Sequence, residues 1–193
     1  MKDNEVPGAA VAVAKGKRIV YSRGFGYADR DAKTPVEPNA KFRIASISKP
    51  ITAVAVLQLV EAGKLKLSDK AFEILDLKPH LEPGTKPDPR LADVTVLQLL
   101  QHTGGWDRDQ SFDPMFRPIR IAETVGVPPP AGPNAIIRYM LGKPLDFAPG
   151  ERYAYSNFGY CVLGRLIEKV SGKPYGTYVR DHILTPLAMH DTQ

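Results

Sequence analysis

Residues 42–63, FRIASISKPITAVAVLQLVEAG, decide the fold of this chain. Residues 47–62 of this segment are almost continuously apolar, and Gly63 follows as a C-terminal stop signal. Pro50 fits the first turn of a helix, where the N–H that proline lacks is not needed. A helix that is apolar on every side belongs in the middle of a domain. The segment therefore predicts a buried central helix over 47–62.

A β-hairpin is expected before this helix. Residues 8–14 and 18–27 are rich in Val, Ala, Ile and aromatic side chains, and Gly16 between them is free to take a positive φ. The segment 29–39 is polar and carries two prolines, so it reads as a connection over the surface. These features predict two antiparallel strands followed by a loop.

The rest of the chain predicts helices and long loops. Thr95 is a good N-cap for a helix that ends near Gln101. A loop is expected over 106–133, and its length indicates a function such as lining a site. Because a two-stranded hairpin is marginal alone, either it lies on the helices as a small α+β layer, or further strands of its sheet are not in this chain. Other helices are expected over 68–74, 134–141, 158–170 and 174–184.

Composition places the chain among ordinary globular proteins. It has 193 residues, 43% apolar and 24% charged, enough to bury a core within one domain. No apolar stretch reaches the roughly 20 residues needed to span a bilayer. The net charge is +5, but the basic residues are scattered rather than gathered on one face, which argues against nucleic acid as a partner. No signal peptide is visible, so a periplasmic, extracellular or cytoplasmic location stays open.

The single cysteine, Cys161, excludes an internal disulfide bond. It lies in a helix-like apolar run with no histidine near it in sequence, which favours a buried packing thiol over a nucleophile. We expect no metal or cofactor.

Ser46-Ile-Ser-Lys49 is the only Ser-x-x-Lys in the chain. Residues three apart near a helix start share a face, so Lys49 can hydrogen-bond the Ser46 hydroxyl. If the helix is buried, Lys49 enters a site held out of water, which favours the neutral amine able to take the serine proton. The helix N-terminus would also direct N–H groups at an oxyanion beside Ser46. The alternative is a surface cap with a solvated lysine, because the motif alone is common.

Tyr155-Ser-Asn157 is the only Tyr-x-Asn. It stands in a loop before a helix, where side chains can point into a cleft. Asparagine can donate to a carbonyl and accept from an ammonium at once, and a phenol beside a lysine can serve as a proton shuttle. The alternative is an aromatic loop residue followed by an asparagine that caps the next helix.

Four ordered segments of the chain resemble one known family, that of the serine β-lactamases and penicillin-binding proteins. They are similar to the class C β-lactamases, the D-Ala-D-Ala carboxypeptidases and related serine esterases. Gly104 stands where the family's Leu-Leu-x-His-Thr-Ser-Gly turn has serine, and Ala188 where its Pro-Leu-Gly-Met segment has glycine. The four segments are FRIASISK (42–49), LLQHTGG (99–105), FAPGERYAYSN (147–157) and PLAMHDT (186–192).

This resemblance implies an α+β, β-lactamase/transpeptidase-like fold with N-terminal antiparallel strands and a mostly helical part. It implies one incomplete domain over 1–193, with a helical subdomain at roughly 64–157. A serine hydrolase of this kind would form an acyl-enzyme with esters, amides or β-lactams, including peptidoglycan-like substrates.

The resemblance also implies the roles of individual residues. Ser46 would be the nucleophile, Lys49 and Tyr155 would share the proton transfers, and Asn157 would bind substrate and orient the lysine. His102 is expected to stabilise its turn rather than to act in catalysis. Trp106 could edge the cleft or pack beneath it.

One family motif has no counterpart here. Members carry Lys-Thr-Gly or His-x-Gly on a strand that lines the opposite side of the site. Lys-Thr-Gly is absent from this sequence, and the one His-x-Gly, at residues 102–104, belongs to the LLQHTGG segment already matched to another family motif. We therefore expect a fragment that lacks chiefly C-terminal strands of the sheet, with uncertain activity by itself. The rival interpretation is a catalytically incomplete, β-lactamase-like binding protein.

Overall fold

The hairpin lies where the sequence predicts it. In the computed structural model, which describes residues 5–192, β1 (Gly8–Lys15) pairs antiparallel with β2 (Arg18–Asp29). Gly16 and Lys17 form the turn, with φ values of 55° and 65°, as tight hairpins require.

A third strand was not expected from the sequence. The segment predicted to be a surface connection contains β3 (Thr34–Pro35), which pairs with the end of β2. The strand is two residues long and lies at the sheet edge, where proline is tolerated because its missing N–H breaks no ladder bond.

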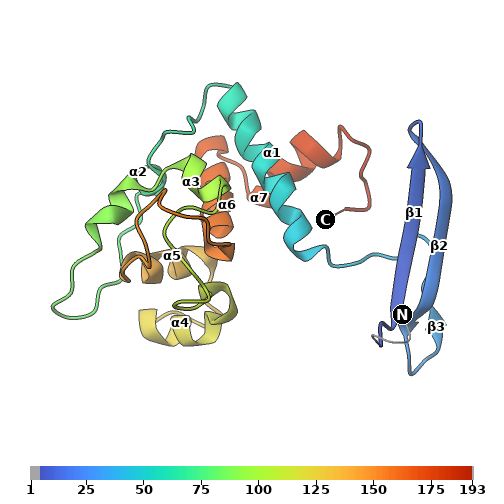
Figure 1. Ribbon diagram of the computed structural model, residues 1–193, viewed down its shortest axis with the longest axis horizontal. Coiled ribbons are helices and arrows are strands. Elements are labelled where there is room, and N and C mark those ends of the chain that lie inside the picture. The colour runs from blue at the N-terminus through green and yellow to red at the C-terminus, as the bar shows by residue number, and fades with distance from the viewer. Residues whose placement is uncertain (1–4, 193) are drawn as a thin grey trace. The chain divides into compact units, whose positions relative to one another are not determined.

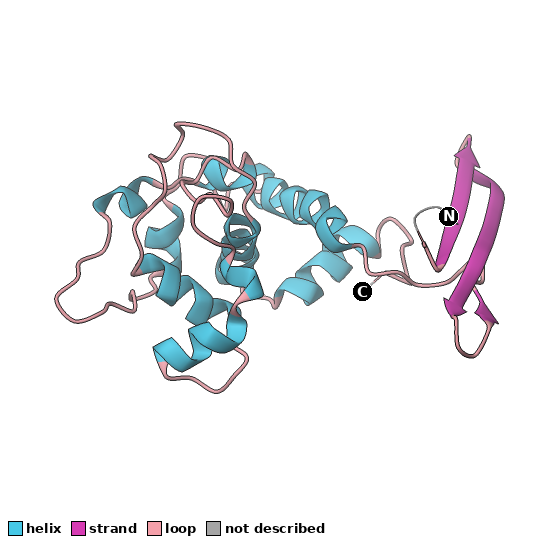
Figure 2. Cartoon of the chain, turned by 60° about the horizontal axis from the view of Figure 1, so that its bottom comes forward, coloured by secondary structure: helices cyan, strands magenta, loops and turns pink. Residues whose placement is uncertain are grey.

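The chain divides into two compact units, one up to Ala45 and one from Ser46 onward. All three strands belong to the first unit and all α-helices to the second (Figure 1, Figure 2). The fold is therefore α+β, as predicted.

The central helix of the prediction is α1 (Ser48–Glu61). Its buried residues, Thr52, Ala55, Val56 and Leu59, form one face. On other faces, Val54 is 44% exposed and Leu57 is 48% exposed. The predicted helix is confirmed, but the expectation that it is buried on every side is wrong for the described residues. An apolar sequence shows which faces could be covered, whereas the neighbouring elements decide which ones are.

The core of the second unit is built around α6 (Asn157–Ser171). This helix contacts α1, α2, α3, α5 and α7. Five of its large side chains are 0–1% exposed, and each contributes about 1.5–3 kcal/mol by leaving water. They are Phe158, Val162, Leu163, Leu166 and Ile167. The partner helices are α2 (Ala71–Leu75), α3 (Val96–Leu100), α5 (Pro133–Leu141) and α7 (Tyr175–Val179).

Capping explains several helix boundaries. Thr95 caps α3 in a capping box with Gln98, as predicted. Ser156, not Asn157, caps α6: the Ser156 hydroxyl accepts from the N–H of Gly159 at 3.1 Å. The helix expected over 134–141 is α5, which begins one residue earlier at Pro133, with Gly132 as its N-cap. The Asn157 side chain is thereby free for other partners.

The predicted loop 106–133 is wrong in its second half. A single 3-10 turn, Pro114–Phe116, and then α4 (Pro118–Val125) lie within it. Pro114 and Pro118 occupy the first positions of these two elements, where proline is compatible with a helix. Over the part of the chain that the structure describes, no helix is long and apolar enough to cross a membrane.

Candidate active site

Ser46 and Lys49 lie at the start of α1. Ser46 is in a 3-10 turn, Ala45–Ile47, that leads directly into the helix. Lys49 Nζ donates to Ser46 Oγ at 3.2 Å, the contact expected from their spacing. Ala45 has a φ of 45°, a left-handed conformation that costs a non-glycine residue about 1–2 kcal/mol. Backbone strain of this kind tends to gather at functional sites.

The loop before α6 brings two further side chains to this pair. Tyr155 Oη lies 2.5 Å from Ser46 Oγ, and Lys49 Nζ donates to Asn157 Oδ1 at 2.7 Å. The ammonium of Lys49 also lies over the Tyr155 ring, 4.7 Å from its centroid. The structure thus assembles all four residues expected from the sequence, which we call the Ser46 cluster: Ser46, Lys49, Tyr155 and Asn157.

The Ser46 cluster is more open than the sequence led us to expect. Ser46 is exposed, while Lys49, Tyr155 and Asn157 are half-buried. The expectation of a fully desolvated lysine depended on α1 being buried on every side. Among the described residues it is not, because only one face of that helix is covered.

The phenol of Tyr155 is biased towards ionisation. Burial is the largest single influence on its pKa and raises it, but interactions with Lys49 and Ser46 outweigh burial. The positive charges of Lys49 and Arg108 act in the same direction, so the pKa of Tyr155 lies below its ordinary value of 10.0. The Arg108 guanidinium stands over the Tyr155 ring, 5.1 Å from the centroid. A tyrosinate here could accept the proton of Ser46.

His102 supports the loop that carries Tyr155. Its Nδ1 accepts the backbone N–H of Ser156 at 3.1 Å, and its carbonyl accepts that of Ala154 at 2.9 Å. Burial, with help from the Lys49 charge, holds the pKa of His102 below its usual value. A neutral ring is what Nδ1 needs in order to accept a hydrogen bond. This supporting role agrees with the expectation that His102 stabilises its turn and does not transfer protons.

Trp106 and Cys161 have packing environments. Trp106 is 5% exposed and packs edge-on against Phe72 and Phe158, so of the two roles considered for it the structure shows packing. Burial raises the pKa of the Cys161 thiol to about 11, which keeps it protonated and unreactive near neutral pH. The prediction of a packing thiol agrees with this environment.

Asp113 and Arg108 were missed in the sequence analysis. Asp113 Oδ2 accepts from Asn157 Nδ2 at 2.7 Å, and Arg108 lies on Tyr155 as described above. The dipeptide Asp113-Pro114 is a start signal for a helical turn and could have been recognised as such. Nothing local indicates that it faces Asn157.

A model of the family described as Beta-lactamase matches residues 1–193. The chain belongs to the Beta-lactamase family. The resemblance inferred from the four sequence segments is confirmed.

Proteins similar to this chain match all or nearly all of it with part of their own length. Protein flp of Staphylococcus aureus (strain MW2) is 30% identical over 194 residues, covering 100% of this chain and 36% of that protein. The octameric penicillin-binding protein homologue from Pyrococcus abyssi has a TM-score of 0.77 and 34% identity, over 98% of this chain and 41% of the other. EstCE1, a hydrolase with promiscuous acyltransferase activity, has a TM-score of 0.75 and 28% identity, over 97% of this chain and 48% of that protein. The chain therefore spans about a third to a half of the length of these relatives.

Two departures from the Beta-lactamase family pattern now have a structural setting. A Cβ at Gly104 would lie 2.7 Å from Cζ3 of Trp106, so the glycine makes room for that ring. Ala188 has a φ of 54°, a conformation that glycine adopts at less cost. The first departure suits this chain's own packing, and the second places an unfavourable residue at a left-handed position.

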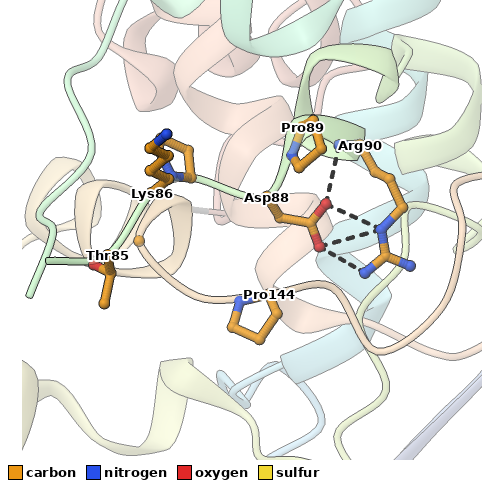
Figure 3. Close-up of a pocket in the computed structure, with 8 residues that line it drawn as sticks. Thr85, Lys86, Asp88, Pro89, Arg90 and Pro144 are labelled. Carbon is orange, nitrogen blue, oxygen red and sulfur yellow. Dashed lines mark hydrogen bonds and ion pairs between the residues drawn. The ribbon is translucent and has the colours of Figure 1, made fainter.

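A separate hollow of about 550 Å³ is lined by residues outside the Ser46 cluster (Figure 3). Its carboxylate, Asp88, accepts from the Arg90 guanidinium at 2.6 Å and from the N–H of Leu145 at 3.0 Å. Arg90 also donates to the carbonyl of Leu145 at 2.9 Å. These polar groups bind one another, so we assign them a structural role rather than a role in ligand binding. The described residues contain no group of three or more His, Cys, Asp or Glu side chains that could hold a metal ion.

Proposed function

We propose that this chain carries the nucleophile of a serine hydrolase that forms an acyl-enzyme on Ser46. The observation that supports the proposal is the environment of one oxygen: Ser46 Oγ lies 2.5 Å from Tyr155 Oη and 3.2 Å from Lys49 Nζ. A hydroxyl within hydrogen-bond reach of a base, which is itself held by a third group, is the arrangement typical of an activated nucleophile.

In the proposed acylation, Ser46 Oγ attacks the carbonyl carbon of the substrate and passes its proton to the ionised phenol of Tyr155. Lys49 Nζ, which donates to Ser46 and to Asn157, stabilises the negative charge shared by the phenol and the attacking oxygen. The backbone N–H of Ser46 would supply one donor to the oxyanion. The leaving alcohol or amine takes the proton from Tyr155 as the tetrahedral intermediate collapses.

Deacylation would repeat these steps with water. A water molecule gives a proton to the Tyr155 phenolate and attacks the acyl carbon. As the tetrahedral intermediate collapses, the bond between the acyl carbon and the Ser46 oxygen breaks, and that oxygen takes the proton back from Tyr155 to become a hydroxyl. Asn157 would orient the acyl group and hold Lys49. The sum is hydrolysis of the acyl bond, with the Ser46 cluster returned to its starting state.

Esters, amides and β-lactams are the proposed substrate classes. The family to which the chain belongs and a hydrolase relative with acyltransferase activity support acyl transfer through an enzyme-bound acyl group. The open setting of Ser46 is compatible with either small or peptidoglycan-like acyl donors.

Covalent labelling tests this proposal. The product of the complete reading frame is treated with a fluorescent fluorophosphonate and, separately, with a fluorescent penicillin. We expect a labelled band, with the adduct located by mass spectrometry on the peptide that contains Ser46, and no band in Ser46→Ala. Ser48→Ala, two residues away in the same segment, is the matched control and should be labelled like the wild type.

Two results would contradict the proposal. An unlabelled wild-type protein that still binds penicillin reversibly would favour the alternative of a catalytically incomplete binding protein. A label retained in Ser46→Ala would place the nucleophile elsewhere.

A further inference from the structure

Asp113 is bound at both of its carboxylate oxygens. Oδ1 accepts the backbone N–H of Met115 at 3.0 Å and so caps the short turn Pro114–Phe116. Oδ2 accepts from Asn157 Nδ2 at 2.7 Å. One side chain therefore links the 106–117 loop to the amide that holds Lys49.

The two neighbours of Asn157 impose the same orientation on its amide. A carboxylate can only accept, so the NH₂ group must face Asp113, and an ammonium can only donate, so Oδ1 must face Lys49. Without the carboxylate, the amide loses the group that fixes its NH₂ end. A flipped amide would place two donors against the ammonium of Lys49 and break the 2.7 Å contact that holds it.

The loop that presents Asp113 is itself anchored. Asp146 Oδ2 accepts the backbone N–H of Asp107 at 2.7 Å and the hydroxyl of Ser111 at 2.9 Å. Arg152 Nη1 donates to Asp107 Oδ2 at 2.8 Å. These contacts tie residues 107 and 111, just before Asp113, to the segment that leads to Tyr155, and so restrict where the Asp113 carboxylate can lie, as a supporting group for a reactive site needs.

We propose that Asp113 is a positioning residue, which fixes the Asn157 amide so that its oxygen holds Lys49 Nζ on Ser46 Oγ. This inference rests on the proposed function, because its consequence is a faster acylation of Ser46. Asp113 itself reaches neither the nucleophile nor the proton-transfer groups, and it acts through Asn157.

The substitution Asp113→Ser separates this role from capping. Serine caps a helical turn about as well as aspartate but is too short to reach Asn157. Asp113→Asn has a single side-chain oxygen, which can accept from the Met115 N–H or from the Asn157 NH₂ group but not from both in their present places. In the product of the complete reading frame, we expect Asp113→Ser to lower the first-order acylation rate constant on the order of 10- to 100-fold, with a much smaller change in the apparent dissociation constant of the label. Asp113→Asn should also lower the rate, though by less than Asp113→Ser, because its one oxygen can still accept from Asn157 if the cap on Met115 is given up.

Asp88 provides the matched control. It precedes Pro89 as Asp113 precedes Pro114, and it caps a 3-10 turn in the same way, but its second partners are Arg90 and Leu145. Asp88→Asn should therefore lower the thermal midpoint and leave the acylation rate constant of the folded protein unchanged.

The outcomes separate the inference from the proposed function. Wild-type acylation rates in Asp113→Ser would overturn the positioning role while Ser46 labelling stands. An equal loss of rate in Asp113→Ser and Asp88→Asn would also overturn it, since it would show a general effect of losing a carboxylate that anchors a loop. Absence of any labelling at Ser46 in the wild type would overturn the proposed function, and the role of Asp113 with it.

Discussion

The imidazole ring of His102 stacks on the phenol ring of Tyr155, with 4.7 Å between the ring centroids and 30° between the planes. The same histidine accepts the N–H of Ser156 through Nδ1. The position of the Tyr155 hydroxyl beside Ser46 therefore depends on a side chain from the turn after α3. The cations Lys49 and Arg108 also lie over the ring of Tyr155 and favour the ionised form of its phenol.

The pH dependence of acylation tests the part played by Tyr155. Because its pKa lies below 10.0, the ionised phenol should become populated as the pH rises towards that value, and the acylation rate should rise with it. Tyr155→Phe should lower the rate about 10²- to 10⁴-fold and remove this rising limb. The measurement is the labelling rate of Ser46 between neutral and alkaline pH. A rising limb of unchanged shape in the phenylalanine variant would assign the titration to another group.

Gly104→Ser should destabilise the protein by about 1–3 kcal/mol, although serine is the residue of the family pattern. The added Cβ would lie 2.7 Å from Cζ3 of the buried Trp106, and the ring has little room to move. Urea unfolding followed by tryptophan fluorescence measures the free energy of unfolding.

Gly176→Ala is the control for the Gly104→Ser substitution. It lies in α7 with open space around its Cα and an ordinary φ, so alanine there should stabilise by about 0.4–1 kcal/mol. Equal effects of the two substitutions would show that the Trp106 contact is not what requires glycine at position 104.

Ala188→Gly should raise stability. Alanine with a φ of 54° is strained by about 1–2 kcal/mol, and glycine removes that strain at the cost of about 0.4–1 kcal/mol of added unfolded-state entropy. A net gain of up to about 1 kcal/mol is expected in the same unfolding assay. A loss of stability would mean that the methyl group of Ala188 makes packing contacts that outweigh the backbone strain.

Asp88 should make unfolding dependent on pH in the acid range. The Arg90 guanidinium lowers the pKa of Asp88 from 3.8 to about 2, with burial opposing and the N–H groups of Leu145 and Arg90 helping. A lowered carboxyl pKa contributes stability that is fully present above 3.8 and is lost as the pH falls through about 2. The contribution is at most about 2 kcal/mol, since Arg90 is partly exposed.

Asp88→Asn should therefore be less stable than the wild type at neutral pH, and the difference should shrink below pH 3.8. Asp93→Asn is the control: its ion pair with Lys70 is exposed, and removing it should change stability by less than about 1 kcal/mol. A constant difference between wild type and Asp88→Asn across this pH range would contradict the assignment.

Local patterns predicted the elements that depend on near neighbours. The hairpin around Gly16, the capping box at Thr95 and the helix over 47–62 are all set by contacts within a few residues. The prediction failed where local signals are ambiguous: the segment around Pro114 and Pro118 was expected to be part of a loop, although proline also begins helices. It failed too for the exposure of α1, which depends on what packs against each face.

The sequence by itself determined that Lys49 can reach Ser46, because residues three apart at a helix start share a face. Only the tertiary structure decided that Tyr155, 109 residues away, lies 2.5 Å from Ser46, and that Asp113 lies against Asn157 across a separation of 44 residues. Contacts at such separations follow from the burial of α6 against its neighbouring helices, which brings distant loops together at the ends of the packed elements. No local pattern carries that information, because it belongs to the packing of the whole unit.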